Sequence, residues 1–333
     1  MISEKDAKQA VLDAAKMLLR EKLVARTWGN VSCRTGKQSY VITPSGLSYE
    51  KMKAEDMASY NMATSEWECS RKPSSERGVH SAAYSAFPEA GFVIHTHQTY
   101  ASALGLGGFE ALRLNDSQKA ALGGIAVAQY ALPGTKKLSK NAAEAFARGA
   151  NVVLLKNHGA VIVAENKDEA FERAKLLEAI CKDAAKGQPE ESSLIRQPGR
   201  LEKLAEQTAP SFPYVSYSFA PAVIEVSNSV SYFRAQLDDM AQMIGTKLIT
   251  VESSLSAVAE GLKKHNAVLV KGLGAVCRAD SQGDCDALKL LVEKACVCYL
   301  HTRALGIRPA LSAFDTTLMR IVYKSKYSKK SED

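Results

Sequence analysis

The sequence has no long apolar run and no leader-like beginning. None of its apolar stretches approaches the roughly 18 residues that a membrane helix needs. Residues 1–6 (MISEKD) mix acidic and basic side chains, so they have neither the basic region nor the apolar segment of a signal peptide. We therefore expect a cytoplasmic protein with no membrane partner.

A disulfide pattern is missing as well. The chain has seven cysteines, an odd number, and no two of them are spaced as C-x-x-C. Such usage is typical of reduced thiols in a cytoplasmic protein and argues against a disulfide framework.

Concentrated charge is the third absence. The formal net charge of +7 is spread along the chain, and its only dense run lies at residues 323–330 (YKSKYSKK). This distribution argues against a nucleic-acid groove and favours anionic small ligands only weakly. A composition of 46% hydrophobic and 24% charged residues is that of an ordinary globular chain, with room for one large or two smaller domains.

Helices and strands are expected to alternate along the chain. Apolar residues at helical spacing predict helices at residues 3–20, 75–87 and 167–186. Short apolar runs predict strands at residues 39–42, 93–97 and 151–155. This alternation predicts a mixed α/β layer fold.

A polar, proline-bearing segment at residues 191–212 is expected to be a linker. It separates a first domain, residues 1–190, from a second, residues 213–333, which ends in the basic tail. Residues 265–276 (HNAVLVKGLGAV) echo residues 149–161 (GANVVLLKNHGAV), and an acidic turn and a long helix follow both. We interpret the second domain as a degenerate partial repeat of the first, with chance similarity of two β-turn-α units as the alternative.

A weaker echo pairs residues 223–227 (VIEVS) with residues 93–97 (VIHTH). If both echoes hold, Glu225, Ser227 and Leu273 stand where the first domain has three histidines. Leucine cannot bind a metal, so the second domain is not expected to be a duplicate active site.

Three histidines in two short segments predict a metal site. His95 and His97 alternate on an expected strand, which puts both imidazoles on one face, and His158 follows the end of another strand. Three protein ligands leave a fourth position open, as in catalytic zinc sites. We expect one divalent metal per chain, zinc first, with Mn²⁺, Co²⁺ or Fe²⁺ as alternatives. His80 stands alone and is interpreted as a core residue.

Glu76 opens the helix that precedes the histidine strand. It could be an ordinary first-turn carboxylate, but beside a metal it becomes a candidate acid/base. The turns at residues 29–32, 43–46 and 73–75 offer hydroxyl and N–H donors without charge. Each alone reads as a turn or a cap, whereas together they could form a neutral nest for a phosphate.

Five motifs in this order, GNVS (29–32), ITPSG (42–46), PSSE (73–76), HTH (95–97) and NHG (157–159), resemble the class II aldolase/adducin family. The resemblance covers about residues 5–186 and implies an α/β/α sandwich around a largely antiparallel sheet. It also implies a homo-oligomer, a dimer or tetramer. By resemblance, His95, His97 and His158 hold the metal and Glu76 is the acid/base. The substrate phosphate would be held by Asn30, Ser45, Gly46, Ser74 and Ser75.

The implied reaction is retro-aldol cleavage of a sugar phosphate through a metal-stabilised enediolate, which makes the protein a metal-dependent lyase. The same site chemistry serves epimerases, dehydratases and decarboxylases, so these remain alternatives. The family's aldolase has a catalytic tyrosine where Ser117 stands here, with Asp116 and Lys119 as candidate replacements. That departure keeps a noncatalytic, adducin-like interaction module as the rival.

Overall fold

The computed structural model describes residues 2–26, 28–190 and 196–326, which divide into two compact units, Met1–Ala184 and Ala185–Asp333. Within the described ranges, no helix is both long and apolar enough to cross a membrane. Each unit has its own sheet and is described by itself.

The first unit is built on an eight-stranded sheet in the order β4-β3-β2-β1-β5-β8-β7-β6. Every neighbouring pair is antiparallel except β6 and β7, which are parallel. The strands are β1 (Asn30–Gly36), β2 (Ser39–Ile42), β3 (Ala58–Asn61), β4 (Trp67–Glu68), β5 (Phe92–Thr96), β6 (Ile125–Ala128), β7 (Val152–Leu155) and β8 (Gly159–Ala164).

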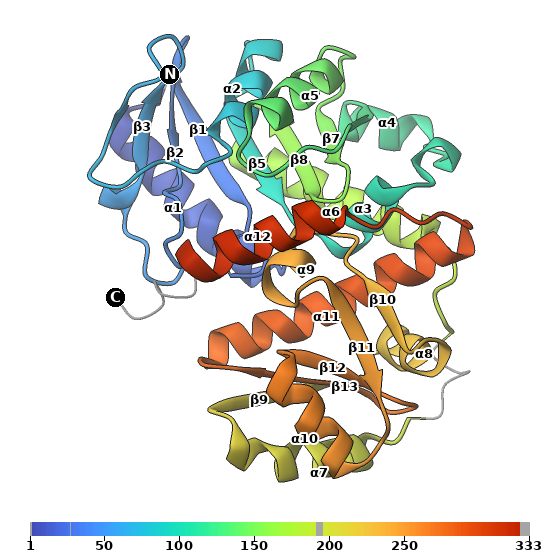
Figure 1. The fold of residues 1–333 in the computed structure, drawn as a ribbon. Coiled ribbons are helices and arrows are strands. Elements are labelled where there is room, and N and C mark those ends of the chain that lie inside the picture. Colours follow the sequence, from blue (N-terminus) through green and yellow to red (C-terminus); the bar gives the residue numbers. More distant parts are fainter. Residues whose placement is uncertain (1, 27, 191–195, 327–333) are drawn as a thin grey trace. The chain divides into compact units, whose positions relative to one another are not determined.

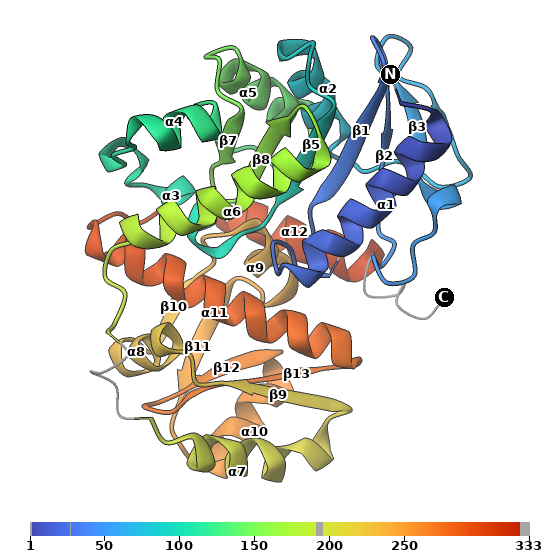
Figure 2. The same cartoon turned by 180° about the vertical axis from the view of Figure 1, so that it is seen from behind.

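Helices cover both faces of this sheet (Figures 1 and 2). They are α1 (Glu4–Arg20), α2 (Arg77–Ala86), α3 (Thr99–Leu106), α4 (Asp116–Leu122), α5 (Lys136–Phe146) and α6 (Lys167–Ala184), with 3-10 turns η1 (Ala54–Asp56) and η2 (Phe109–Ala111). Helices α2 and α5 pack on one face over a core that includes Tyr40, Leu138 and Phe146. Helices α1, α3 and α6 pack on the other. The predicted α/β/α sandwich around a largely antiparallel sheet is confirmed.

The second unit has a five-stranded sheet in the order β10-β11-β12-β13-β9. Its strands are β9 (Tyr214–Ser218), β10 (Tyr232–Arg234), β11 (Lys247–Val251), β12 (Ala267–Val270) and β13 (Gly274–Ala279). Its helices are α7 (Pro198–Thr208), α8 (Pro221–Ser229), α9 (Asp238–Met243), α10 (Leu255–Lys264), α11 (Gln282–Ala304) and α12 (Ala313–Lys326), with the 3-10 turn η4 (Ala209–Ser211). Helices α7 and α10 contact the sheet from one side and α8 and α11 from the other (Figure 2).

Four strands of each sheet follow the same path. The order β5-β8-β7-β6 in the first unit matches β9-β13-β12-β11 in the second, and only the last pair is parallel in both. Helices α3, α5 and α6 have their counterparts in α8, α10 and α11 by chain order. By chain order α7 stands where α2 stands in the first unit, and it packs beside α10 as α2 packs beside α5. The described part of the second unit has nothing that corresponds to α1 and β1–β4. The second domain is therefore a smaller, related α/β fold.

The weaker echo between residues 223–227 and the strand at residues 93–97 is wrong, because residues 223–227 belong to α8. Pro221 occupies an early position of this helix, where its missing N–H costs nothing, and a short apolar run cannot by itself distinguish a strand from a helix. The strand that pairs with β13 is β9 instead. The second-unit positions that correspond to His95 and His97 are therefore Tyr217 and Phe219. Leu273 still corresponds to His158, as the sequence comparison predicts.

The expected linker at residues 191–212 also differs from the structure. Residues 191–195 lie outside the described residues, but most of the remainder forms α7, whose Leu201, Leu204 and Ala205 join the core of the second unit. These apolar residues recur at helical spacing, but polar residues surround them, so the segment as a whole resembles a linker. In the basic tail, residues 323–326 end α12 and the rest lie outside the described residues.

Candidate metal centre

Two chain segments bring the three predicted histidines together. His95 lies on β5, His97 follows the end of that strand, and His158 lies in the turn between β7 and β8. The turn needs Asn157 in the left-handed region at φ 61°, a conformation that asparagine tolerates. A side chain at Gly159 would bring its Cβ within 2.2 Å of the Thr96 carbonyl oxygen, so glycine lets the turn approach β5 closely.

The ring nitrogens of the three histidines converge. His95 Nε2 lies 2.9 Å from His158 Nε2 and 3.1 Å from His97 Nε2, and the three ligand atoms all lie within 4.8 Å of one another. Two nitrogens bound to one tetrahedral zinc at roughly 2.0–2.1 Å stand about 3.3 Å apart, close to these separations. Within the described residues, this is the one such cluster of potential ligands. The residues present therefore fit a divalent metal.

The tautomer of His95 suits metal binding. Its Nδ1 lies 2.9 Å from the Ala160 carbonyl oxygen, which can only accept a hydrogen bond, so the proton sits on Nδ1. Nε2 then presents its lone pair to the space that the three rings share. A backbone carbonyl that fixes the outer nitrogen of a ligand histidine is a common feature of metal sites.

Glu76 points its carboxylate at the same space. Its Oε1 lies 3.2 Å from His158 Nε2 and its Oε2 lies 3.3 Å from His95 Nε2. Burial favours the neutral acid, but positive charge on His158, His95 and His97, when these rings are protonated, outweighs burial and holds the pKa of Glu76 well below its usual range. A bound metal cation would act in the same direction. Glu76 is the N-cap residue of α2, one position before the helix, and is 8% exposed. An ionised, buried carboxylate thus lies beside the proposed metal position.

Asn30 contacts Glu76 rather than open space. Its Nδ2 donates to Glu76 Oε2 at 2.9 Å, and its Oδ1 accepts a short hydrogen bond from His80 Nε2. The side chain is 4% exposed.

The structure joins the other two predicted phosphate turns. Ser45 N donates to Lys72 O at 2.9 Å and Ser74 N donates to Thr43 O at 3.0 Å, which forms a bridge between Pro44 and Pro73. Ser74 is buried, and its Oγ accepts a hydrogen bond from Glu76 N at 3.2 Å. Ser75 is exposed, and Gly46 adopts φ 74° beside the half-buried Ser45. The two turns therefore lie together at the start of α2.

The β1 strand reaches the same place. Val31 N donates to Thr43 Oγ1 at 3.2 Å, and Thr43 N donates to Val31 O at 3.1 Å. Asn30, next along this strand, is thereby held near the paired turns. All five residues predicted to bind phosphate come from segments that hydrogen-bond to one another.

Residues that the sequence reasoning missed lie behind Asn30. His80, interpreted as a lone core residue, is fully buried and hydrogen-bonds to both Asn30 and Ser32, and Ser32 in turn contacts Tyr84. The spacing of these residues in the sequence could have indicated that they lie together. Glu76, His80 and Tyr84 recur every fourth residue along one helix face, and Asn30 and Ser32 alternate on one strand face.

Ser117, the departure from the family pattern, lies exposed on α4. Asp116 and Lys119 flank it and form a pair with each other, with Lys119 Nζ 3.3 Å from Asp116 Oδ1. Both side chains are solvent-exposed, so the described part of this chain does not give either of them the dry surroundings that a tuned acid/base needs.

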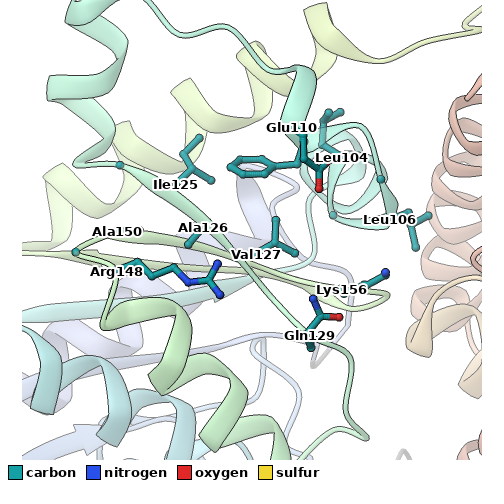
Figure 3. Close-up of a pocket in the computed structure, with 15 residues that line it drawn as sticks. Leu104, Leu106, Glu110, Ile125, Ala126, Val127, Gln129, Arg148, Ala150 and Lys156 are labelled. Carbon is teal, nitrogen blue, oxygen red and sulfur yellow. The ribbon is translucent and has the colours of Figure 1, made fainter.

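A separate groove of about 410 Å³ runs along β6 (Figure 3). Its lining includes Leu104, Val127 and the basic side chains of Arg148 and Lys156. None of the predicted site residues lines it. The groove is thus distinct from the cluster of His95, His97 and His158, called the tripod below, although Lys156 lies two residues before His158.

The chain belongs to the family of the Class II Aldolase and Adducin N-terminal domain, whose profile matches residues 9–185. An L-ribulose-5-phosphate 4-epimerase, UlaF, of Salmonella paratyphi C is 44% identical over 97 residues, which is 29% of this chain and 42% of that protein. The UlaF protein of Salmonella typhi gives the same figures. The chain spans less than half the length of these relatives.

Two solved structures are similar in part. An L-fuculose 1-phosphate aldolase is 34% identical, with a TM-score of 0.49, over 55% of this chain and 86% of that one. A sugar-phosphate aldolase from Thermotoga maritima is 18% identical, with a TM-score of 0.47, over 54% of this chain and 93% of that one.

Proposed function

We propose that the protein is a metal-dependent lyase that cleaves a sugar phosphate by a retro-aldol reaction. The observation that carries this proposal is the convergence of three imidazole Nε2 atoms and the Glu76 carboxylate on one buried point. His95, His97 and His158 would hold one divalent ion, zinc in the first instance. When bound, such an ion supplies Lewis-acid stabilisation for negative charge that develops on substrate oxygens.

The protein's own part in the reaction falls to Glu76 and the paired turns. An ionised carboxylate at this position can accept a proton from the substrate and return it to the carbon that becomes negative when the carbon–carbon bond breaks. Burial excludes water from the carboxylate, so the proton stays between Glu76 and the substrate. The N–H and hydroxyl groups of Ser45, Gly46, Ser74, Ser75 and Asn30 would hold the phosphate, since neutral donors at a helix start suit an anion.

Epimerisation is the second candidate, because the UlaF relatives carry an epimerase name and share 44% identity over the matched segment. Metal analysis comes first as the test of any enzyme function. Gently purified protein should contain about one zinc, manganese, cobalt or iron per chain, and His95→Ala should lose it. A substoichiometric metal content that His95→Ala leaves unchanged would refute the metal site and favour the adducin-like interaction module.

A panel of ketose phosphates then decides the reaction. Release of a triose phosphate or another aldehyde fragment supports the lyase. Inversion at one carbon without fragmentation supports the epimerase, and carbon dioxide or loss of water would identify a decarboxylase or dehydratase.

The phosphate pocket has its own test. Hydrogen bonds to a charged group contribute about 1.5–3 kcal/mol. Ser74→Ala or Ser75→Ala should therefore raise KM for phosphorylated substrates by roughly tenfold or more, with little change in kcat. Equal weakening for the unphosphorylated sugar would argue against a phosphate pocket. Thr64→Ala, at a surface turn, is the matched control.

We also propose that the second unit arose as a degenerate partial repeat of the first, because strand order and the parallel pair agree. A homo-oligomer in the cytoplasm is proposed in addition. Family resemblance supports the oligomer, and seven free cysteines support a reducing compartment. Light scattering on the full chain tests the first of these two, and localisation of the tagged chain in its host tests the second.

A further inference from the structure

A line of buried hydrogen bonds runs from Glu76 away from the tripod. Asn30 Nδ2 contacts Glu76, Asn30 Oδ1 contacts His80 Nε2, His80 Nδ1 lies 2.6 Å from Ser32 Oγ, and Ser32 Oγ lies 2.9 Å from Tyr84 Oη. Each of these five side chains is less than a tenth exposed, and Ser32 and His80 are fully buried. The proposed reaction assigns no role to the last three.

Donor and acceptor chemistry fixes the direction of every bond. Asn30 Oδ1 can only accept, so His80 Nε2 must carry the proton. The neutral ring then has a bare Nδ1, to which Ser32 Oγ–H donates, and the Ser32 oxygen in turn accepts from Tyr84 Oη–H. Burial, with a smaller effect from His95, lowers the pKa of His80 to about 3, which keeps the ring neutral as this pattern requires.

The same chemistry fixes the Asn30 amide. If the Asn30 amide rotated by half a turn, its oxygen would face the Glu76 carboxylate and would lose the hydrogen bond from His80 Nε2. The Nε2–H of His80 therefore holds the orientation in which Asn30 donates to Glu76. The outer end of the line is anchored too, because the Arg34 guanidinium lies 4.5 Å over the Tyr84 ring and donates to the Tyr84 carbonyl.

Metal binding makes this donor more important. Histidine nitrogens that bind a metal carry no proton on that nitrogen, so they cannot donate to Glu76. Among the described side chains that contact the carboxylate, Asn30 is then the one that still donates. A glutamate has several rotatable bonds, and a general acid/base must be held close to its working position.

We propose that His80, Ser32 and Tyr84 form a positioning relay that acts through Asn30 to fix the Glu76 carboxylate. This inference rests on the proposed function, in which Glu76 moves the proton. The three residues touch neither substrate nor metal. Outer residues that orient groups at metal sites typically contribute 10–100-fold to activity.

Two buried tyrosines give a matched comparison. Tyr84 belongs to α2 and Tyr40 to β2, with ring centroids 5.1 Å apart, but the Tyr40 hydroxyl contacts Arg77 O and Ser81 Oγ of α2 instead of the relay. Each Tyr→Phe change removes one buried hydroxyl. On the metal-loaded enzyme, we expect Tyr84→Phe to lower kcat several-fold at unchanged zinc content, and Tyr40→Phe to leave kcat within twofold. Equal effects of the two changes would overturn the relay.

His80 variants extend the test. His80→Phe keeps an aromatic ring but removes both hydrogen-bonding nitrogens, and should lower kcat by about 10–100-fold while zinc content stays within twofold. KM for a phosphorylated substrate should rise as well, because Asn30 is also a proposed phosphate ligand. His80→Gln can still donate to Asn30, so it should recover a large part of that loss. If both variants retain full turnover, or if Gln is no better than Phe, His80 does not position Glu76.

A readout without turnover separates this inference from the proposed function. Nitrogen–proton NMR of the histidine side chains in zinc-loaded protein should show His80 as the neutral Nε2–H tautomer from pH 5 to 8. A crystal structure of zinc-loaded His80→Phe should show the Asn30 amide and the Glu76 carboxylate displaced from their wild-type positions. An Nδ1–H or protonated His80, or an unmoved carboxylate, refutes the relay. If no sugar phosphate turns over but both results appear, the proposed reaction fails and the relay stands.

Discussion

His95, His97 and His158 of the first unit correspond to Tyr217, Phe219 and Leu273 of the second, as strand pairing shows. His95 pairs with Val161 across β5 and β8, and Tyr217 pairs with Val276 across β9 and β13. The turns agree as well, with Asn157 at φ 61° in one and Gly272 at φ 75° in the other. Similar backbone thus presents three nitrogen ligands in one unit and three apolar or aromatic side chains in the other.

Supporting contacts agree between the units too. Glu178 on α6 accepts from Tyr100 N and Ala101 N at the start of α3, and Glu293 on α11 accepts from Ser218 Oγ just before α8. In the second unit, Leu273 joins a core cluster that also contains Leu201 of α7. The comparison teaches that the strand ends and turn are a property of the scaffold. The proposed reaction additionally needs the ligands, Glu76 and the phosphate turns. Helix α7 takes the place of α2 in the second unit, but β1–β4 and the turns between them have no counterpart among its described residues.

The largest difference should appear when matched positions are changed. His95→Ala removes one of the three proposed ligands, and loss of a metal ion worth several kcal/mol should lower turnover by about a thousandfold or more. Tyr217→Ala, at the matched position, should leave metal content and turnover unchanged. Elemental analysis and turnover measured on the same samples check both. A strong loss of metal in Tyr217→Ala would mean that metal binding does not depend on His95 alone of these two matched positions.

Glu76→Gln should give the next effect. Glutamine keeps the size of the side chain but cannot move a proton, so kcat should fall by about 10²–10⁴-fold with the metal retained. Glu293→Gln, in the second unit, is the control and should leave kcat unchanged. Substantial residual turnover in Glu76→Gln would remove Glu76 from the acid/base role.

The sequence predicted the first unit better than the second, for physical reasons. His95, His97 and His158 stand at strand ends, where alternation and chain order dictate their meeting. The helix of residues 221–229 was mistaken for a strand because VIEV is too short to show a period. Leu201 and Leu204 were hidden in a polar segment. His80 was dismissed because its partners, Asn30 and Ser32, lie about fifty residues away, and only the pairing of β1 with β5 brings that strand beneath α2.

Two glycines sharpen the comparison of scaffolds. A Cβ at Gly159 would lie 2.2 Å from Thr96 O, and a Cβ at Gly274 would lie 2.1 Å from Ser218 O. Overpacking of this kind costs typically 1–3 kcal/mol. Gly159→Ala and Gly274→Ala should each lower the unfolding free energy by about that amount in urea titrations, but only Gly159→Ala should also weaken zinc binding. A neutral Gly274→Ala would show that the second unit no longer depends on this close approach.

The smallest expected effect is the pH dependence of stability that His80 causes. Burial disfavours the charged ring and lowers the pKa of His80 in the folded chain from its ordinary value of 6.5 to about 3. Below pH 6.5 the unfolded chain takes up a proton that the folded chain does not, so stability is lost as the pH falls from 6.5 towards 3. The slope approaches about 1.4 kcal/mol per pH unit for one proton. His80→Gln removes this titration but leaves the tripod in place. The stability advantage of wild type over His80→Gln should therefore shrink by roughly 1 kcal/mol between pH 6 and 5 in urea titrations of zinc-loaded protein. A difference that stays constant over this range would mean that His80 takes up a proton in the folded state as readily as in the unfolded chain, which the hydrogen bonds to Asn30 and Ser32 do not allow.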